Sequence, residues 1–345
     1  MSKHISNLLI LLVLTISACT KQPEYFLTQG EIFHTTTHIK YQYDRDLRNE
    51  IFARLDCFDL SLNPFNPRSI LYQVNNNQEV EVDDWFIAVF RKAQEIATLT
   101  GGAYDVTCAP LVNLWGFGFE KQDTISTETI DSLLQFVGYQ KIWLENRKVK
   151  KSDPRVKLDF SSIAKGYAVD VTAELLESYG IKNYMVEIGG EVRAKGKNPE
   201  GEIWKIAITK PIEDSTGMIN EQQQVVELED YAIATSGNYR NFYIKDSKKY
   251  AHTIDLQTGY PVETNVLSAS VFAPDCMTAD AWATACMALG VEKFCALAAK
   301  IPKLEYYLLY VDDCGNWQEK QFIIRCNHYL QSGGFGIRSE MHKPI

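Results

Sequence analysis

The stretch 158-LDFSSIAKGYAVDVTAELLESYGIKNYMVEIGGEVRAKGK-197 joins a helical pattern to two strand patterns. Apolar residues recur at every fourth position, at Ile163, Tyr167, Val171 and Leu175. This spacing predicts a helix that starts near Ser161 or Ser162 and ends at Gly180. Strands are expected at residues 184–188 and 192–195, and the Gly-Gly pair between them predicts a hairpin or a glycine bend.

The same patterns alternate irregularly along the rest of the chain. Helical spacing occurs at residues 44–60, 83–100 and 278–289. Strand patterns occur at residues 33–41, 203–209, 231–235, 242–244 and 267–272. The chain has no G-x-G-x-x-G or Walker A motif, and its alternation is too irregular for a doubly wound sheet. We therefore expect an α+β fold with mixed or antiparallel sheets and several long helices.

The bulk composition sets limits on partners. The chain has 345 residues, 46% of them apolar, with a net charge of -9 and a pI near 5.3. An acidic chain without a basic patch lacks the electrostatic footprint of a nucleic-acid-binding protein. If such a protein handles a phosphorylated ligand, a lysine, a helix N-terminus or a divalent metal must offset the like charges.

The N-terminal residues 1-MSKHISNLLILLVLTISAC-19 are typical of an export signal. The apolar run at residues 8–16 is too short to span a bilayer as a mature helix. Small residues then precede Cys19, an arrangement that resembles the lipobox of bacterial lipoproteins. The alternative is an ordinary signal peptide with an incidental cysteine. We expect a signal peptide over 1–18, a lipidated tether over 19–29, one domain over 30–338 and a tail over 339–345.

Eight cysteines occur in the chain, without a CxxC pair or a zinc-ligand spacing. With Cys19 lipidated, an odd number remains, so at least one thiol should be unpaired. A bridge between Cys314 and Cys326 would fit across a hairpin. Most of the others lie in apolar contexts, where cysteine acts as a small buried hydrophobe.

Two helical segments carry residues suited to phosphate and metal chemistry. Lys165 lies near the start of its predicted helix, where a lysine and free amides together would bind an anion. An exposed lysine on a capped helix is the plainer interpretation. Asp280 and Thr284 are four residues apart on one helical face, and a carboxylate with a hydroxyl suits a hard divalent cation. An aspartate placed early in its helix to favour the dipole would show the same pattern.

Two loops complete the candidate site. The segment 101-GGAYDVTCAPLVNLWGFG-118 surrounds Asp105 with aromatic residues and could wall a flat ring, as could an ordinary aromatic loop. The segment 247-SKKYAHTIDLQTGYPVET-264 contains His252, which titrates near neutral pH and could act as a general base. Asp255 could orient that histidine, and the turn at Gly259 and Pro261 would hold the loop. By itself a lone histidine is more often structural.

Taken together and in this order, these segments resemble the ApbE family, the FAD:protein FMN transferases. The resemblance runs from about Gly30 to Gly336 and rests on the segments GGAYDVTCAPLVNLWGFG, LDFSSIAKGYAVD, VEIGGEVRAKG, ATSGNYRNFY with YAHTIDLQTGYPV, and TADAWATACMALG. It implies an ApbE-like, T-fold-related domain that binds FAD with Mg²⁺ and transfers FMN to a threonine hydroxyl of a target protein, releasing AMP. The alternatives are a Mg²⁺-dependent FAD pyrophosphatase and a non-catalytic flavin-binding lipoprotein.

The resemblance also implies roles for individual residues. The metal ligands correspond to Ser162, through its backbone carbonyl, with Asp280 and Thr284. The proposed base corresponds to His252. The FAD-contacting positions correspond to Phe33, Phe65, Ala103, Tyr104, Asp105, Lys165 and Ile254.

This chain departs from the family pattern at two places. The family's Met-Gly-Thr-Thr appears as 33-FHTT-36, so Phe33 replaces methionine and His34 replaces glycine. Phe65 stands where a ring-stacking tyrosine is usual; phenylalanine can still stack but lacks the hydroxyl. The resemblance further implies an exported lipoprotein that faces the periplasm. Its acceptor would be a redox-pump subunit or an exported flavoprotein.

Overall fold

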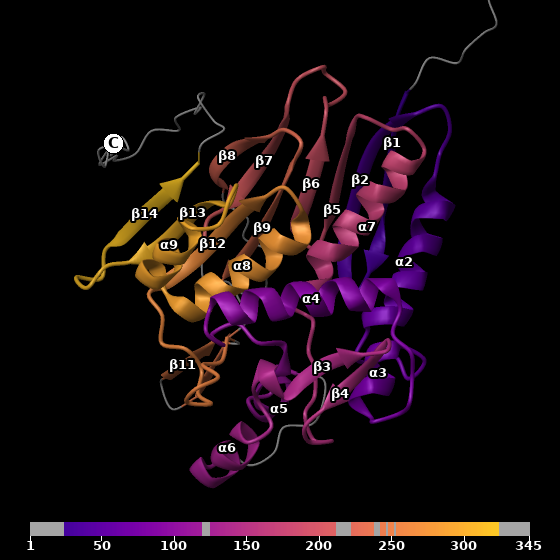
Figure 1. Ribbon diagram of the computed structural model, residues 1–345. Helices are drawn as coiled ribbons and strands as arrows, with labels where there is room; N and C mark the ends of the chain where they lie inside the picture. Colours follow the sequence, from indigo (N-terminus) through magenta and orange to yellow (C-terminus); the bar gives the residue numbers. More distant parts are fainter. Residues whose placement is uncertain are drawn as a thin grey trace, which may run out of the picture.

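Figure 1 shows the computed structural model, which describes residues 24–118, 125–211, 222–237, 242–245, 248–251 and 253–323. Its centre is an eight-stranded sheet in the order β1-β2-β5-β6-β9-β12-β13-β14, in which every neighbouring pair is antiparallel. The strands are β1 (Glu24–Ile32), β2 (Thr35–Tyr43), β5 (Tyr184–Ile188), β6 (Glu191–Lys195), β9 (Tyr231–Gly237), β12 (Val266–Ala273), β13 (Glu305–Val311) and β14 (Trp317–Phe322).

Helices and three two-stranded ribbons surround this sheet. The helices are α2 (Arg48–Leu62), α3 (Ile70–Asn75), α4 (Asp84–Leu99), α5 (Ala109–Leu114), α6 (Thr127–Leu134), α7 (Ala164–Ser178), α8 (Cys276–Leu289) and α9 (Val291–Ala298), with 3-10 turns η1 (Val106–Cys108) and η2 (Tyr139–Lys141). The ribbons pair β3 (Ile142–Glu145) with β4 (Lys148–Lys151), β7 (Trp204–Thr209) with β8 (Gln222–Leu228), and β10 (Phe242–Lys245) with β11 (Lys248–Ala251). The α+β prediction is confirmed, with antiparallel sheets.

The middle strands of the sheet are buried on both faces because their side chains alternate between two cores. Helices α7 and α8 lie against one face, and α4 runs across them (Figure 1). On β9, Ala232 and Ala234 contact this helical layer, where small side chains let a helix approach closely. Ile233 points the other way and packs with Trp204 of β7 and Leu228 of β8. This alternation is the period of two expected for a strand.

The strongest helical and strand patterns were located closely from the sequence. The helix predicted at 83–100 is α4, and the helix predicted at 278–289 is α8. Strands predicted at 231–235 and 267–272 are β9 and β12. Asp83 caps α4 by accepting a hydrogen bond from the Phe86 amide, which fixes the start of that helix.

The N-terminal predictions need two corrections. Residues 24–29, placed in a tether, form most of β1, which pairs with β2 along its whole length. The strand predicted at 33–41 begins only at Thr35, because Phe33 and His34 form the turn between β1 and β2. The folded part of the chain therefore includes residues that were assigned to the tether. Cys19 and the signal segment lie outside the described residues.

The start of α7 also differs from the prediction. The helix begins at Ala164, and its N-cap residue Ile163 makes no side-chain cap. Neither Ser161 nor Ser162 caps it. Its amide at Gly166 is instead satisfied by a residue of α8, as described below.

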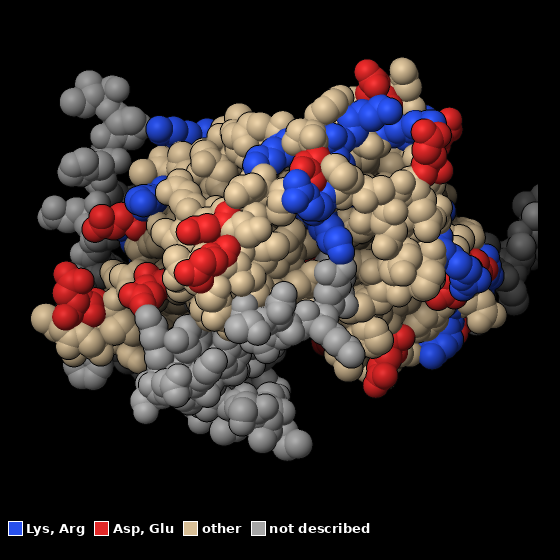
Figure 2. Space-filling view, turned by 90° about the horizontal axis from the view of Figure 1, so that it is seen from below, with Lys and Arg blue, Asp and Glu red and all other residues tan. Residues whose placement is uncertain are grey.

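The six cysteines in the described part of the chain are all free thiols: Cys57, Cys108, Cys276, Cys286, Cys295 and Cys314. Cys326 lies outside it, so the Cys314–Cys326 bridge stays a prediction. Among the helices of the described residues, none has the length and apolar character needed to cross a bilayer. Viewed from below, acidic and basic side chains are interspersed over the described surface (Figure 2).

Candidate functional site

A cleft of about 900 Å³ lies where the first turn of α7, the middle of α8, the β5–β6 turn and the end of β9 meet. Such a volume suits a ligand of cofactor size. The cleft is lined by eight of the residues predicted from the sequence: Ala103, Tyr104, Asp105, Ser162, Lys165, Ile254, Asp280 and Thr284. The fold therefore gathers segments that are more than 170 residues apart in the sequence into one site. His252 lies outside the described residues.

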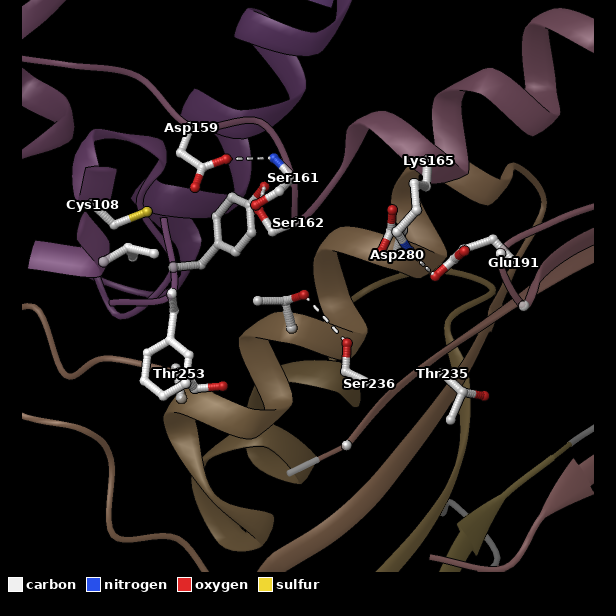
Figure 3. A pocket seen from close by; sticks show the side chains of 18 of the residues that line it. Cys108, Asp159, Ser161, Ser162, Lys165, Glu191, Thr235, Ser236, Thr253 and Asp280 are labelled. Carbon is white, nitrogen blue, oxygen red and sulfur yellow. Dashed lines mark hydrogen bonds and ion pairs between the residues drawn. The ribbon is translucent and has the colours of Figure 1, made fainter. Parts of the chain in front are cut away.

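A charged triad forms one wall of the cleft. Lys165 Nζ is 2.5 Å from Glu191 Oε1, and Figure 3 shows Asp280 beside them. Glu191 begins β6 directly after the Gly189-Gly190 turn and is buried. Its second oxygen, Oε2, has no hydrogen-bond partner within the described residues. A buried carboxylate oxygen without a partner is costly, so it marks a place where a ligand or water would be accommodated.

Burial and mutual charge perturb the pKa values of this triad. Burial is the largest influence on Glu191 and raises its pKa to about 7, with Lys165 opposing and Asp280 adding to the rise. Burial likewise raises the pKa of Asp280, against the lowering effect of Lys165. For Lys165 burial would lower the pKa, but the two carboxylates outweigh it and raise the pKa above its ordinary value. Lys165 is therefore a firmly charged cation in the cleft.

Asp280 links α8 to the start of α7. Its Oδ2 accepts a hydrogen bond of 2.9 Å from the Gly166 amide. Gly166 lies in the first turn of α7, where amides have no partner within the helix. The carboxylate of Asp280 supplies that partner, and Ser162, which precedes the N-cap residue Ile163, lines the cleft outside the helix.

The oxygen donors here fit a hard divalent cation. Asp280, Thr284 and Ser162 all line the cleft, which brings together a carboxylate, a hydroxyl and a backbone carbonyl outside the helix. Mg²⁺ prefers such oxygen ligands and usually completes its shell with water and substrate phosphate. Thr284 Oγ1 lies 3.3 Å from Ser236 Oγ of β9, which holds the hydroxyl in place. The described residues contain no group of three His, Cys, Asp or Glu side chains that could hold a metal.

The opposite wall is a loop fixed by its own aspartate. Asp105 Oδ1 accepts from the amide and hydroxyl of Thr107, both at 2.8 Å, and Oδ2 accepts from the Tyr139 amide at 2.5 Å. The Tyr104 hydroxyl accepts from Ser162 Oγ at 3.0 Å, which ties this loop to the start of α7. Asp105 thus supports the wall, whereas Tyr104 forms part of it. Figure 3 shows Cys108, Asp159, Ser161 and Ser162 on this side.

The turn that follows His252 is held rigidly. Thr253 and Ile254 line the cleft. Gly259 donates to the Asp255 carbonyl at 2.7 Å and accepts a hydrogen bond of 2.8 Å from the indole of Trp115. A Cβ at Gly259 would lie 2.3 Å from Ile130, and its φ of +75° also requires glycine. The expectation that this turn stiffens the loop agrees with these contacts.

A second, smaller pocket adjoins the cleft. It has a volume of about 210 Å³ and is lined by Phe33, His34, Phe58, Asp59, Leu62, Asn63, Pro64, Phe65, Ser161, Ala164 and Lys165. Ser161 and Lys165 line both pockets. The two remaining predicted FAD contacts, Phe33 and Phe65, are therefore in the mostly apolar pocket, and Lys165 stands between it and the polar cleft.

Sequence reasoning missed Glu191 and Asp159. Glu191 pairs with Lys165, which is 26 positions away in the sequence, and no local spacing predicts that contact. The one available signal was an acidic residue directly after Gly189-Gly190 in a segment otherwise typical of buried strands. Asp159 is buried, its pKa is raised by burial, and it accepts a hydrogen bond of 2.8 Å from the Ser161 amide.

Fold and site together define an α+β protein whose cleft suits a phosphate-bearing ligand and whose side pocket suits a flat ring. The model of the ApbE family matches residues 33–308. The chain is 37% identical over 331 residues to the FAD:protein FMN transferase of Haemophilus influenzae, covering 91% of this chain and 95% of that protein. The chain belongs to the ApbE family.

Solved structures agree with this assignment. The flavin transferase ApbE from Vibrio cholerae matches with a TM-score of 0.78 and 36% identity, over 87% of this chain and 97% of that one. The flavinyl transferase ApbE from Pseudomonas stutzeri, in its apo form, matches with a TM-score of 0.76 and 30% identity, over 88% of this chain and 96% of that one.

Proposed function

We propose that this protein transfers FMN from FAD to a threonine hydroxyl of a target protein and releases AMP. One observation carries the proposal: Lys165, Asp280, Thr284 and Ser162 line a single cleft that opens beside an apolar ring pocket. A dinucleotide with a flat ring and a pyrophosphate has those two kinds of surface. Relatives that match over most of the chain carry the name FAD:protein FMN transferase.

Different residues bind the phosphates, the flavin ring and the metal ion. Lys165 and the first turn of α7 attract the anionic pyrophosphate, because a helix N-terminus carries partial positive charge. Phe33 and Phe65 contact the flavin ring in the smaller pocket. Asp280, Thr284 and the Ser162 carbonyl would hold Mg²⁺, which would supply positive charge to offset the negative charge that develops on the leaving group.

The transfer is a displacement at the phosphorus atom of FMN. The threonine oxygen of the acceptor attacks this phosphorus, and the bond to the bridging oxygen of the pyrophosphate breaks. AMP leaves with the bridging oxygen and its electron pair. His252 takes the proton of the threonine hydroxyl, and Lys165 neutralises phosphate charge throughout. Thr253 and Ile254, which follow His252 in the sequence, line the cleft and support this placement.

Export and anchoring belong to the same proposal. The apolar run followed by Ser17, Ala18 and Cys19 supports cleavage before Cys19 and lipidation of that residue. The protein would then be anchored to a membrane and face the periplasm. Its acceptor is a flavoprotein of that compartment, a redox-pump subunit or an exported protein.

One experiment separates this function from its alternatives. The full-length protein in detergent is incubated with FAD, Mg²⁺ and a threonine-bearing acceptor protein. Flavin bound covalently to the acceptor, with one AMP released per label, is the expected result. Free FMN and AMP without labelled acceptor would show a pyrophosphatase, and bound but intact FAD would show a carrier. A threonine-to-alanine acceptor is the control and should stay unlabelled.

A further inference from the structure

The turn between β1 and β2 holds two bulky residues in a conformation that suits glycine. The strands pair up to Ile32 and Thr35, so only Phe33 and His34 form the turn. Their φ values are +53° and +58°. Two-residue hairpin turns with both residues at positive φ strongly prefer Asn-Gly, because side chains with a Cβ are strained there. The chain therefore keeps an unfavourable pair of residues at this turn.

Packing accounts for Phe33 but leaves His34 unexplained. The ring of Phe33 packs edge-on against Phe58, with 6.0 Å between ring centroids, and so adds to the core. His34 is exposed, and it has no hydrogen bond or ion pair with any other described residue. Its one aromatic contact is an edge-on approach to Phe65, with ring centroids 6.4 Å apart at 84°. Strained residues that the fold does not require tend to occur at functional sites.

Phe65 faces His34 from a second rigid loop. The residue is 59% exposed, although a large apolar ring is usually buried. The loop is fixed through Asn63, whose Oδ1 accepts from the amides of Phe65 at 2.7 Å and Asn66 at 3.2 Å. Ser69 Oγ also donates to the Asn63 carbonyl. Two rings are thus presented at the mouth of the smaller pocket by backbones that resist movement.

We propose that His34 is a specificity-determining residue that contacts the flat ring of the bound flavin. This deepens the proposed function and rests on it. The pocket that His34 lines shares Ser161 and Lys165 with the cleft, so one ligand can place its ring in the pocket and its phosphates beside Lys165. Phe65 offers a face for stacking, and His34 contacts the same ring from the rim.

A matched pair of glycine variants tests the proposal. His34→Gly removes the imidazole and relieves the strain. Arg147→Gly is the control, because Arg147 also has φ +58° and, with Asn146, forms the two-residue turn between β3 and β4. Arg147 lines neither pocket. Dissociation constants are measured for the full-length protein in buffer with a chelator, so that FAD is not consumed. Flavin fluorescence measures the binding of FAD and of riboflavin, and calorimetry measures the binding of ADP.

We expect both variants to melt a few degrees above the parent protein, because glycine relieves positive φ. His34→Gly should weaken FAD and riboflavin binding about three- to tenfold, the range expected for one lost ring contact, and leave ADP binding unchanged. His34→Asn, which tolerates positive φ, should show the same loss. Equal FAD affinity in parent and His34→Gly, or an equal loss in Arg147→Gly, overturns the proposal. A parent protein that binds no FAD would instead overturn the proposed function.

Discussion

Asp170 and Asp280 each accept hydrogen bonds from the first turn of the helix that carries the other. Asp170 of α7 accepts from the amides of Cys276 and Met277 of α8, at 2.9 and 2.8 Å. Asp280 of α8 accepts from the Gly166 amide of α7 at 2.9 Å. The first amides of a helix have no partner within it, and a carboxylate there also favours the helix dipole. This exchange fixes the crossing of the two helices and places Asp280 at the edge of the cleft.

Replacing Asp170 should destabilise the protein. Asp170 also accepts from Arg193 at 2.8 Å, so Asp170→Asn turns an NH2 donor toward buried donors that then lack an acceptor. We expect the free energy of unfolding at pH 7 to fall by about 2 kcal/mol, the cost of a buried donor left unpaired. Urea denaturation measures this. Asp153→Asn is the control: Asp153 pairs with Arg155 at the surface, where an ion pair contributes little. A loss no larger than the control's would contradict the capping role.

The contribution of Asp170 to the free energy of unfolding should also depend on pH. Burial, only partly offset by Arg193, raises the pKa of Asp170 to about 6. Between the ordinary pKa of an aspartate, about 3.9, and this value, the folded state binds more protons than the unfolded state. Stability from this residue is therefore full below about pH 4, falls as the pH rises to 6, and is constant above.

Urea unfolding of the parent and Asp170→Asn proteins across this range provides the test. Because one pKa unit corresponds to about 1.4 kcal/mol, the advantage of the parent should be about 3 kcal/mol larger at pH 4 than at pH 7. Because the two proteins are compared at the same pH, the contributions of the other titrating groups to the free energy of unfolding cancel. An advantage that grows as the pH rises would reverse the sign and reject the assignment.

Gly166→Ala should destabilise the protein although alanine normally favours a helix. In an open helix the change would add about 1 kcal/mol of stability. Here a Cβ would lie 2.3 Å from the Cys276 carbonyl oxygen and 2.7 Å from Asp280 Cβ, so α7 and α8 must move apart. We expect a net loss of about 2 kcal/mol, typical of overpacking. Thermal unfolding measures it, with Glu174→Ala, exposed on the same helix, as the control; a rise in melting temperature for Gly166→Ala would refute the close approach.

Local patterns were enough to predict most of the regular elements. The apolar stripe of α4 and the alternation in β9 and β12 are properties of short windows, so their bounds were nearly right. Contacts between distant residues decided the rest. The start of α7 is set by Asp280, which is 114 positions from Gly166, and a sequence window cannot contain that pairing.

In the candidate site, too, the residues within clear local patterns were predicted and those defined by distant contacts were not. Lys165, Asp280 and Thr284 could be named because each lies in a helix whose pattern is clear. Glu191 was missed because its function is defined by contact with Lys165, which depends on how β6 is placed against α7. Residues 24–29 are predicted as a tether because they follow Cys19, and the turn at Phe33-His34 lacks the Asn-Gly signal that would have indicated a hairpin there.

Two substitutions at Asp280 should separate its structural and metal roles. Asp280→Asn keeps an oxygen that can accept from the Gly166 amide, whereas Asp280→Ala leaves that buried amide without a partner. We expect Asn to preserve the melting temperature within a few degrees, and Ala to cost about 1–3 kcal/mol. Both should lower Mg²⁺-dependent transfer at least about 100-fold, because the anionic ligand is lost.

Calorimetric titration with Mg²⁺ checks the metal role directly. The parent protein should bind Mg²⁺ in the presence of FAD, and neither variant should. Thr278→Ser, a mild change near the start of α8, is the control for the general effect of a substitution in that helix, and it should bind Mg²⁺ as the parent does. Full activity of the parent in metal-free, chelated buffer would remove the cation from the proposed function.

His252→Ala should abolish transfer while leaving FAD binding intact. A general base contributes about 10²–10⁴-fold to a rate, so labelling of the acceptor threonine should fall by that factor. FAD affinity should not change, because the phosphates contact Lys165 and the ring contacts Phe33 and Phe65. Single-turnover labelling and fluorescence titration measure the two quantities. His38→Ala is the matched control, since His38 pairs with Glu187 and lines neither pocket. Transfer at the parent rate by His252→Ala would assign the proton to another acceptor, and a parallel loss of FAD affinity would assign His252 to binding.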